Sequence, residues 1–335
     1  LPNENYAREI LELHTLGRGA YLGVAPTTSV AKLYGGVTLG FSDQDILQAS
    51  RAFSGWTLEQ GQMGAIGPMP NTGRFAYNRV QHNTQAGQFM GIDLSPFRGD
   101  MEQGNVVLDI IAYHPLTADF VIAKLARRIF GDAPPPDVIA RAKTAWMVHR
   151  NAPDQIGRVL RAILLDGPEI GNAYTANSKL RRPYERIIAF FRLIDATVNA
   201  FDLASSAATA LGDGLFVWPT PEGRPDTDAQ WLSTSANVYN WNLLLLLLSQ
   251  PQFRTTLAQQ TPADVSRSPT ALVEYWVGRM VGYALRPPAM NALIVDAASA
   301  TGAMGAYASG GITNIENALK RLVALIGCSA EFGIR

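Results

Sequence analysis

The feature that most constrains this chain is a succession of helix signals that continues, with three interruptions, to residue 327. Each segment has apolar residues at helical spacing, and several begin with proline or aspartate. Pro115 and Gly131 delimit one of them, because proline is tolerated in the first turn of a helix and glycine commonly follows its end. The pattern therefore predicts helices over residues 3–17, 42–56, 105–114, 114–131, 134–151, 152–167 and 181–198. Three or four more helices are expected after residue 230, the last of them over residues 313–327.

Three stretches lack helical spacing. Residues 17–41 and 57–100 are rich in glycine and polar residues, and residues 211–230 form a Pro/Gly-rich connection. Within the second stretch, RFAYNRVQHN and GQFMGID are typical of a short hairpin or of two extended pieces. We therefore predict one all-α, bundle-like, multi-helix domain over residues 1–335, with a small extended or β insertion near residues 73–92.

The balance of charge limits the kinds of partner. Lys and Arg together number 28, as do Asp and Glu, so the net charge is zero and nucleic-acid binding is not expected. Charged residues make up 17% of the chain, against about 25% in typical soluble domains. Part of the surface is therefore expected to be amide-rich or covered by a protein partner. Cys328 stands alone, which excludes a disulfide framework and a thiolate metal cluster.

The longest apolar run is the leucine block at residues 243–248. It is far shorter than the about 20 residues that span a bilayer, and it ends at Ser249, Gln250 and Pro251. No transmembrane span is predicted. We interpret the block as a helix that is buried all round.

The opening stretch LPNENYAREILELHTLG carries a dense set of polar side chains on one helix. At about 100° per residue, Glu4, Arg8 and Glu12 share an arc, while His14 falls in the middle of the apolar face and is expected to be buried. Glu9 lies about 140° from His14, so the two cannot bind one ion from this helix alone. The polar arc is either a solvated ladder of ion pairs or one wall of a cleft.

Six residues are candidates for a chemical site. The metal candidates are His14, His82 and His114, and the catalytic candidates are Glu9, Glu12 and Asp109. Together they would suit zinc or another divalent ion, or acid/base catalysis of hydrolysis. The competing interpretation is structural: His114 bonds backbone groups between two helices, and Asp109 pairs with a basic side chain of the next helix. No cofactor-binding motif is present, and a divalent metal is the one cofactor that these residues allow.

Aromatic residues in loops and at helix ends allow a carbohydrate-binding function, because exposed rings stack on sugars. Such rings could bind a sugar chain, and Glu9 and Glu12 could supply the paired carboxylates for glycoside cleavage. The alternative is that the tryptophans anchor Pro/Gly-rich connections to the core. The aromatic candidates are Trp56, Tyr77, Trp218, Trp231, Tyr239 and Trp241.

Several blocks resemble a known family in order along the chain. PNENYAREILELHTLG, QDILQASRAFSGWT and VLDIIAYHPLTADFVIAKLARRIFGDAPPP resemble signatures of the bacterial domain of unknown function 1800 family. The family has a helical region before the first signature, so the resemblance implies that this chain is the C-terminal part of a larger protein. The family's His-Asp pair is His82-Asn83 here, which removes a carboxylate from that point.

The resemblance implies an exported protein of the periplasm, cell surface or medium, and it implies no reaction. We expect an extracytoplasmic structural or binding component of a surface or secreted assembly. Its expected partner is another protein or its own missing N-terminal half, and carbohydrate is a possible ligand. The alternative is a secreted hydrolase, metal-assisted or not, that acts on a polysaccharide or another polymer.

Overall fold

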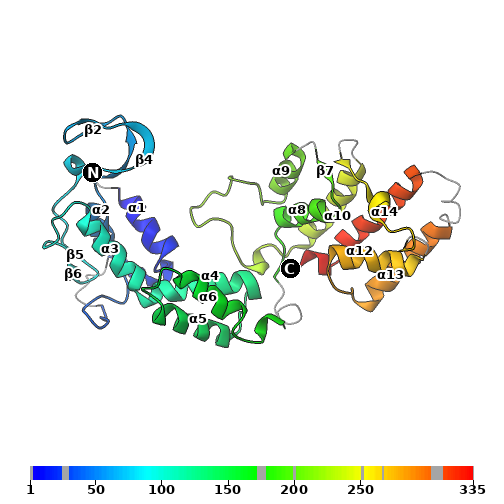
Figure 1. Cartoon of the computed structure of the whole chain (residues 1–335), viewed down its shortest axis with the longest axis horizontal. Coiled ribbons are helices and arrows are strands. Elements are labelled where there is room, and N and C mark those ends of the chain that lie inside the picture. The colour runs from blue at the N-terminus through cyan, green and yellow to red at the C-terminus, as the bar shows by residue number, and fades with distance from the viewer. Residues whose placement is uncertain are drawn as a thin grey trace. The chain divides into compact units, whose positions relative to one another are not determined.

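The computed structural model describes residues 3–24, 30–171, 179–198, 201–249, 253–265, 268–302 and 312–334. Most of these residues are helical, with short strands beside the helices (Figure 1). We expected one helical domain, and the chain divides into two compact units. The first comprises residues 1–126 and 134–170, and the second comprises residues 127–133 and 171–335. Each unit has its own cluster of buried apolar residues.

Two helices of the first unit, those predicted to start near residues 3 and 42, begin at capping residues. Asn3 caps the opening helix by accepting a hydrogen bond from Tyr6 N at 3.2 Å, and Ser42 forms a capping box with Asp45. The opening helix continues past Glu9 as a π-helical turn over Ile10–His14. The helices are α1 (Glu4–Glu9), α2 (Asp43–Ala52), α3 (Glu102–Tyr113), α4 (Pro115–Phe130, which extends into the second unit), α5 (Pro136–Val148) and α6 (Gln155–Leu164).

The extended region is wider than the predicted insertion at residues 73–92. A two-stranded antiparallel ribbon, β1 (Trp56–Gln60) with β4 (Asn71–Tyr77), carries the small hairpin β2 (Met63–Gly64) and β3 (Gly67–Pro68) at its end. A third pair, β5 (Gln88–Phe89) with β6 (Ile92–Asp93), follows. The helix predicted over residues 42–56 ends early, since α2 stops at Ala52 and the ribbon begins at Trp56. Gly55 makes this break possible with φ of 85°, and a Cβ there would lie 2.7 Å from the carbonyl oxygen of Asn78.

The core of the first unit joins α1, α2 and α3 to the β5–β6 pair. Leu11, Phe41, Ile46 and Phe89 are all fully or almost fully buried in it. Asp45 is the polar link: its carboxylate accepts from Ser42 N and Ser42 Oγ at 2.8 Å and from Met90 N at 2.6 Å. The irregular segments are therefore attached to the helices by buried hydrogen bonds as well as by apolar contact.

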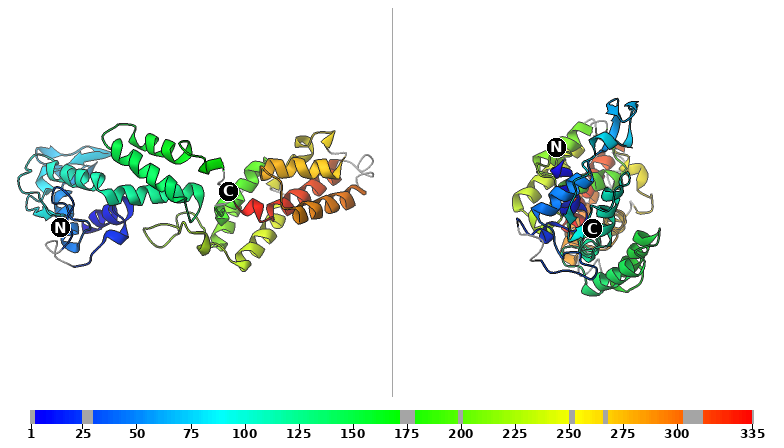
Figure 2. Two further views of the ribbon diagram at one scale, coloured as in Figure 1. Left: turned by 90° about the horizontal axis from the view of Figure 1, so that it is seen from below. Right: turned by 90° about the vertical axis from the view of Figure 1, so that its left-hand side faces the viewer.

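The second unit is built from helices around one apolar cluster. Phe190, Leu247, Trp276 and Phe332 are fully buried there, and α12, α13 and α14 lie side by side (Figure 2). The helices are α8 (Pro183–Leu193), α9 (Phe201–Ala210), α10 (Thr234–Ser249), α11 (Leu257–Gln260), α12 (Pro269–Met280), α13 (Pro287–Gly302) and α14 (Ile312–Gly327), and the strands β7 (Thr197–Val198) and β8 (Phe253–Arg254) pair.

The expectation that the leucine block is buried all round is wrong. Leu244 and Leu247 are buried against the core, but Leu245 is 49% exposed and Leu246 is 52% exposed. The cause is helix geometry: α10 turns one side toward α14, and consecutive leucines at about 100° per residue cannot all face that side.

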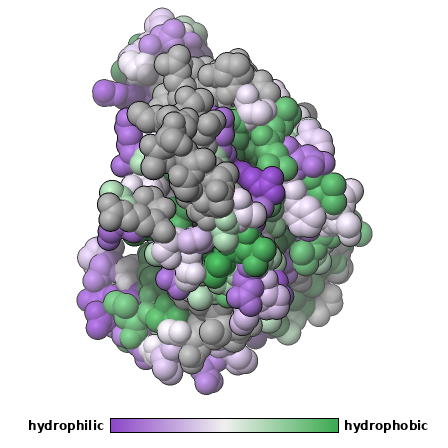
Figure 3. All heavy atoms as spheres, turned by 90° about the vertical axis from the view of Figure 1, so that its right-hand side faces the viewer, coloured by the Kyte–Doolittle hydropathy of each residue, from purple (hydrophilic) through white to green (hydrophobic). Residues whose placement is uncertain are grey.

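The surface drawn in Figure 3 is mixed, with hydrophobic side chains between hydrophilic ones.

The Pro/Gly-rich connection over residues 211–230 is irregular, as predicted, apart from one 3₁₀ turn at Asp228–Gln230. Trp218 packs on Trp231, with ring centroids 6.1 Å apart, and Trp231 Nε1 donates to the carbonyl oxygen of Pro225 at 2.9 Å. Buried Asp213 accepts from Tyr184 N at 2.9 Å and pairs with Arg224 at 2.6 Å. These contacts give the connection a defined path.

Across the described ranges, no single helix combines the length and hydropathy needed to cross a membrane. The bent pair α3 and α4, with an angle of 61° between them, meets that criterion jointly by length and composition alone.

Candidate functional site

The first unit contains a hollow of about 1300 Å³ between the start of α1, the end of α2, the β1–β4 ribbon and the segment after β4. None of the described residues that line it carries a formal charge when histidine is neutral. The lining residues are Asn3, Tyr6, Ser50, Phe53, Ser54, Gly55, Trp56, Thr57, Leu58, Phe75, Gln81, His82, Asn83, Thr84 and Gln85.

Four aromatic rings follow one another along the hollow. The ring centroids are 5.5 Å apart from Tyr6 to Phe53, 5.2 Å from Phe53 to Trp56 and 5.6 Å from Trp56 to Phe75, each pair edge to face. Trp56 is set against α3 at Gly104, where a Cβ would lie 2.6 Å from the indole ring. The rings come from α1, the end of α2, β1 and β4, so only the folded unit assembles them.

Uncharged polar groups complete the lining. The side chains of Gln81, Thr84 and Gln85 are exposed and make no hydrogen bond within the described part of the chain, and the same holds for the Tyr6 hydroxyl. Amides and hydroxyls both donate and accept, so these groups are available to a ligand.

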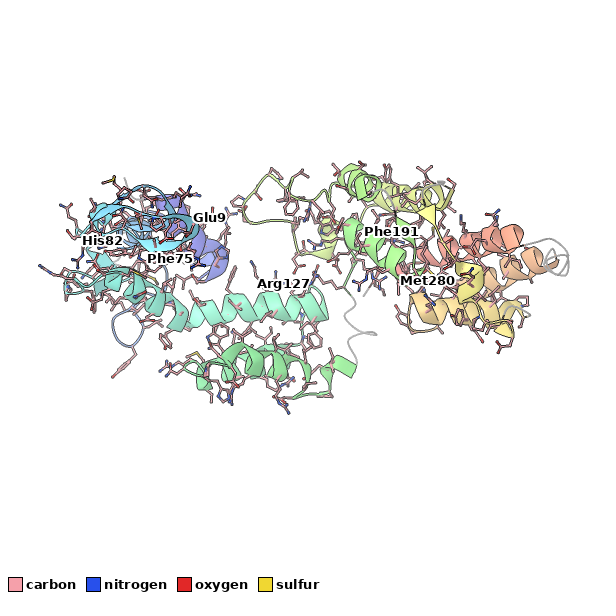
Figure 4. The ribbon with its side chains drawn as sticks, turned by 45° about the horizontal axis from the view of Figure 1, so that its top comes forward. Glu9, Phe75, His82, Arg127, Phe191 and Met280 are labelled. Atoms are coloured by element: carbon pink, nitrogen blue, oxygen red, sulfur yellow. The ribbon has the colours of Figure 1, made fainter. Side chains whose placement is uncertain are left out.

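His82 is the one predicted metal ligand that lines the hollow (Figure 4). Its Nδ1 lies 2.9 Å from the carbonyl oxygen of Ser54. A carbonyl only accepts, so Nδ1 carries the hydrogen, and in the neutral ring Nε2 is an acceptor. The ring also packs on Tyr77, with centroids 5.8 Å apart.

Ser54 does not form a nucleophile–base pair with His82, although its Oγ lies 3.3 Å from His82 Nδ1. Ser54 Oγ donates to the carbonyl oxygen of Arg51 and accepts from Asn83 N at 2.7 Å. Because Nδ1 already carries a hydrogen, it cannot take the serine proton. The contact therefore holds the segment around His82 in place.

His114 has a structural environment. It is 2% exposed, its Nε2 lies 3.1 Å from the carbonyl oxygen of Thr38, and its Nδ1 accepts from Leu116 N at 3.2 Å. Burial lowers the pKa of His114, although the bond to Thr38 opposes this effect. Both ring nitrogens bond backbone groups, so neither has a lone pair for a metal.

The expectation that His14 faces inward is wrong, because its side chain is exposed. It closes the π-helical turn over Ile10–His14. Bonding from i to i+5 widens the turn, so each residue advances by less than the about 100° of an α-helix. The sequence pattern could not show this local change, which rotates His14 away from the buried face of Ala7 and Leu11.

The three carboxylate candidates lie outside the hollow lining. Glu12 pairs with Arg8 at 3.1 Å and with Arg18 at 3.9 Å. Glu9 is half-buried on α1 (Figure 4), and Asp109 is exposed on α3. Within the described ranges, no three His, Cys, Asp or Glu side chains are grouped so that they could hold a metal ion.

A smaller hollow of about 360 Å³ lies at the polar face of α1. Two of its charged groups pair, since Arg8 donates to Asp43 at 3.2 Å, and the Tyr21 hydroxyl also donates to Asp43 at 2.6 Å. The hydrogen bond from Tyr21, with that from Arg8, holds the pKa of Asp43 below its usual value. These groups connect the opening helix to α2.

Most of the polar lining was not predicted from the sequence. Trp56 was among the aromatic candidates and His82 among the histidines, but Gln81, Thr84 and Gln85 carried no motif. The available signal was the uncharged run QHNTQ at residues 81–85, between two extended stretches.

The chain matches the model of the family described as "Protein of unknown function (DUF1800)" over residues 1–334, and it therefore belongs to that family. This confirms the resemblance seen in the signature blocks. A search of the curated proteins and a search of the solved structures gave no match.

Proposed function

We propose that this DUF1800 protein is a non-catalytic binding component that acts outside the cytoplasm, and that its first unit binds an uncharged ligand. The observation that carries the proposal is the hollow of about 1300 Å³, whose lining has aromatic rings, amides and hydroxyls and no formally charged side chain. Ligand sites are typically concave and largely apolar, with a few polar groups that orient the ligand.

The lack of charge in the lining favours a neutral ligand. A charged group that enters such a hollow loses hydration, and no opposite charge in the lining compensates for that loss. Free amides such as Gln81 and Gln85 replace the lost hydrogen bonds of a neutral polar ligand.

The extracytoplasmic setting rests on the family resemblance. A protein partner is supported by α10, on which Val238, Trp241 and Leu245 are 44%, 39% and 49% exposed. These residues occur at i, i+3 and i+7, so they share one face of the helix. Some of the uncharged surface that the composition predicts is therefore apolar surface on α10, which a protein partner could cover.

The hydrolase alternative would need two carboxylates, or a histidine with a carboxylate, in one concave site. The hollow contributes His82 alone, and Glu9, Glu12 and Asp109 lie outside its lining. Binding is therefore the function that this geometry supports better.

The test is amide hydrogen exchange of the purified chain with a panel of uncharged and charged polymers and oligomers. Binding of an uncharged ligand should slow exchange at residues 53–58 and 81–85. The proposal fails if only charged ligands bind, or if protection occurs elsewhere. Protection at these residues together with cleavage of the ligand would support the hydrolase alternative instead.

A further inference from the structure

We infer that the ligand of the hollow is a neutral saccharide chain several sugar rings long; this inference rests on the proposed function. A pyranose has apolar C–H faces and a circumference of hydroxyl groups. The hollow presents the complementary groups, with the aromatic succession from Tyr6 to Phe75 and the free amides of Gln81 and Gln85 beside it.

His82 favours a ligand that donates a hydrogen bond. Its Nδ1–H is committed to the carbonyl oxygen of Ser54 at 2.9 Å, so the Nε2 of the neutral ring can only accept. A sugar hydroxyl can donate to Nε2 and accept from a neighbouring amide at once. A polyester or polyether offers acceptors alone and would leave Nε2 without a partner.

The backbone donors of residues 81–83, on one side of the hollow, are not free to bind an extended peptide. Peptides that add to a sheet edge need free main-chain donors. Here Gln81 N bonds Asn78 O at 3.0 Å, His82 N bonds Arg79 O at 3.2 Å, and Asn83 N bonds Ser54 Oγ at 2.7 Å. The side chains are the free groups, and side-chain amides suit hydroxyls.

Size indicates a chain rather than a single sugar. The hollow of about 1300 Å³ exceeds the roughly 300–1,000 Å³ of sites that enclose a small molecule. The described lining has no Lys or Arg, so acidic sugars gain no ion pair there. It has no Asp or Glu either, so it supplies no acid/base pair that would cleave the chain.

The experiment measures affinity by calorimetry for three sets of ligands: neutral oligosaccharides of increasing length, uronic-acid oligosaccharides and uncharged peptides. The neutral set covers glucans, mannans, galactans and N-acetylglucosamine polymers. Affinity should rise with chain length for at least one neutral glycan and should be at least tenfold weaker for uronic-acid chains of equal length.

Two variants locate the binding. Phe75 is 55% exposed, so Phe75→Ala should fold normally and weaken glycan binding by about tenfold through the lost stacking. Gln85→Ala should weaken it several-fold. Phe216→Ala is the matched control, since this ring is 101% exposed and belongs to the second unit, and it should leave affinity unchanged.

The outcomes separate the two proposals. If an uncharged peptide protects the hollow and no neutral glycan does, the saccharide inference is overturned and the binding function remains. If no uncharged ligand of any class protects the hollow, both are overturned. Glycan binding that Phe75→Ala does not weaken would place the glycan elsewhere and refute the inference.

Discussion

The two units differ in the interactions that hold their segments together. The first holds irregular segments in place with buried hydrogen bonds, such as those of Asp45 and His114 to the backbone of Met90 and Thr38. The second is a set of helices around one apolar cluster that includes Phe190 and Trp276. Asp213 fixes an irregular segment of the second unit in the same way, through Tyr184 N. The first unit differs in that its irregular segments also border a hollow lined by uncommitted polar groups such as Gln81 and Gln85.

The strongest test of this contrast is in the apolar core of the second unit. Leu247→Ala should cost about 2–5 kcal/mol of unfolding free energy, because Leu247 is 0% exposed and its loss leaves a cavity. Leu245→Ala, two residues away and 49% exposed, should cost less than about 0.5 kcal/mol. Denaturant unfolding with hydrogen exchange in both units measures this. Equal costs for the two leucines would contradict the one-sided burial of α10.

A polar substitution should have a comparable, somewhat smaller effect in the first unit. Asp45→Ala removes the acceptor for Ser42 N and Met90 N, so two buried N–H groups lose their partner. We expect a loss of about 2–3 kcal/mol, with hydrogen exchange accelerated at residues 86–94. Asp109→Ala, at an exposed carboxylate, is the control. An unchanged exchange rate at residues 86–94 would show that apolar contact alone holds the β5–β6 pair.

The response to pH should differ between the units. Burial lowers the pKa of His114 below its ordinary value of 6.5, so the unfolded chain binds a proton that the folded chain does not. The stability of the first unit should therefore fall as the pH decreases from about 7.5 to about 5.5. All four histidines belong to the first unit, so the second should change little.

The control for this pH dependence is His114→Gln, which keeps a donor toward Thr38 and cannot titrate. It should lower stability at neutral pH and flatten the pH profile of the first unit, followed by hydrogen exchange at each pH. A profile that keeps its slope in this variant would assign the pH dependence to other groups.

The smallest expected effect concerns the opening helix. Glu9 is half-buried, makes no ion pair among the described residues and lies outside the hollow lining. Glu9→Gln should therefore change the unfolding free energy by less than about 0.5 kcal/mol and leave ligand affinity unchanged. Loss of a polymer-degrading activity in this variant, with folding intact, would instead establish the hydrolase alternative.

Much of the helical architecture could be predicted from local signals. The helices predicted to start near residues 3 and 42 do so, with Asn3 and Ser42 as their caps, and Pro115 opens α4 as predicted. Capping and proline effects act over a few residues, so they can be recognised from neighbouring residues in the sequence. The β1–β4 ribbon was only partly predicted, because its pairing of Trp56 with Tyr77 joins residues that are distant in sequence.

The sequence by itself determined the family, the mostly helical fold and the positions of the caps, since these depend on composition and on spacing along the chain. Only the tertiary structure decided which side chains face one another. It placed His114 in the core, turned His14 outward through a π-helical turn, and left Leu245 exposed. It also brought Tyr6, Phe53, Trp56 and Phe75 into one succession of rings, because chain reversals at Gly55 and in the β1–β4 ribbon fix distances that no local pattern contains.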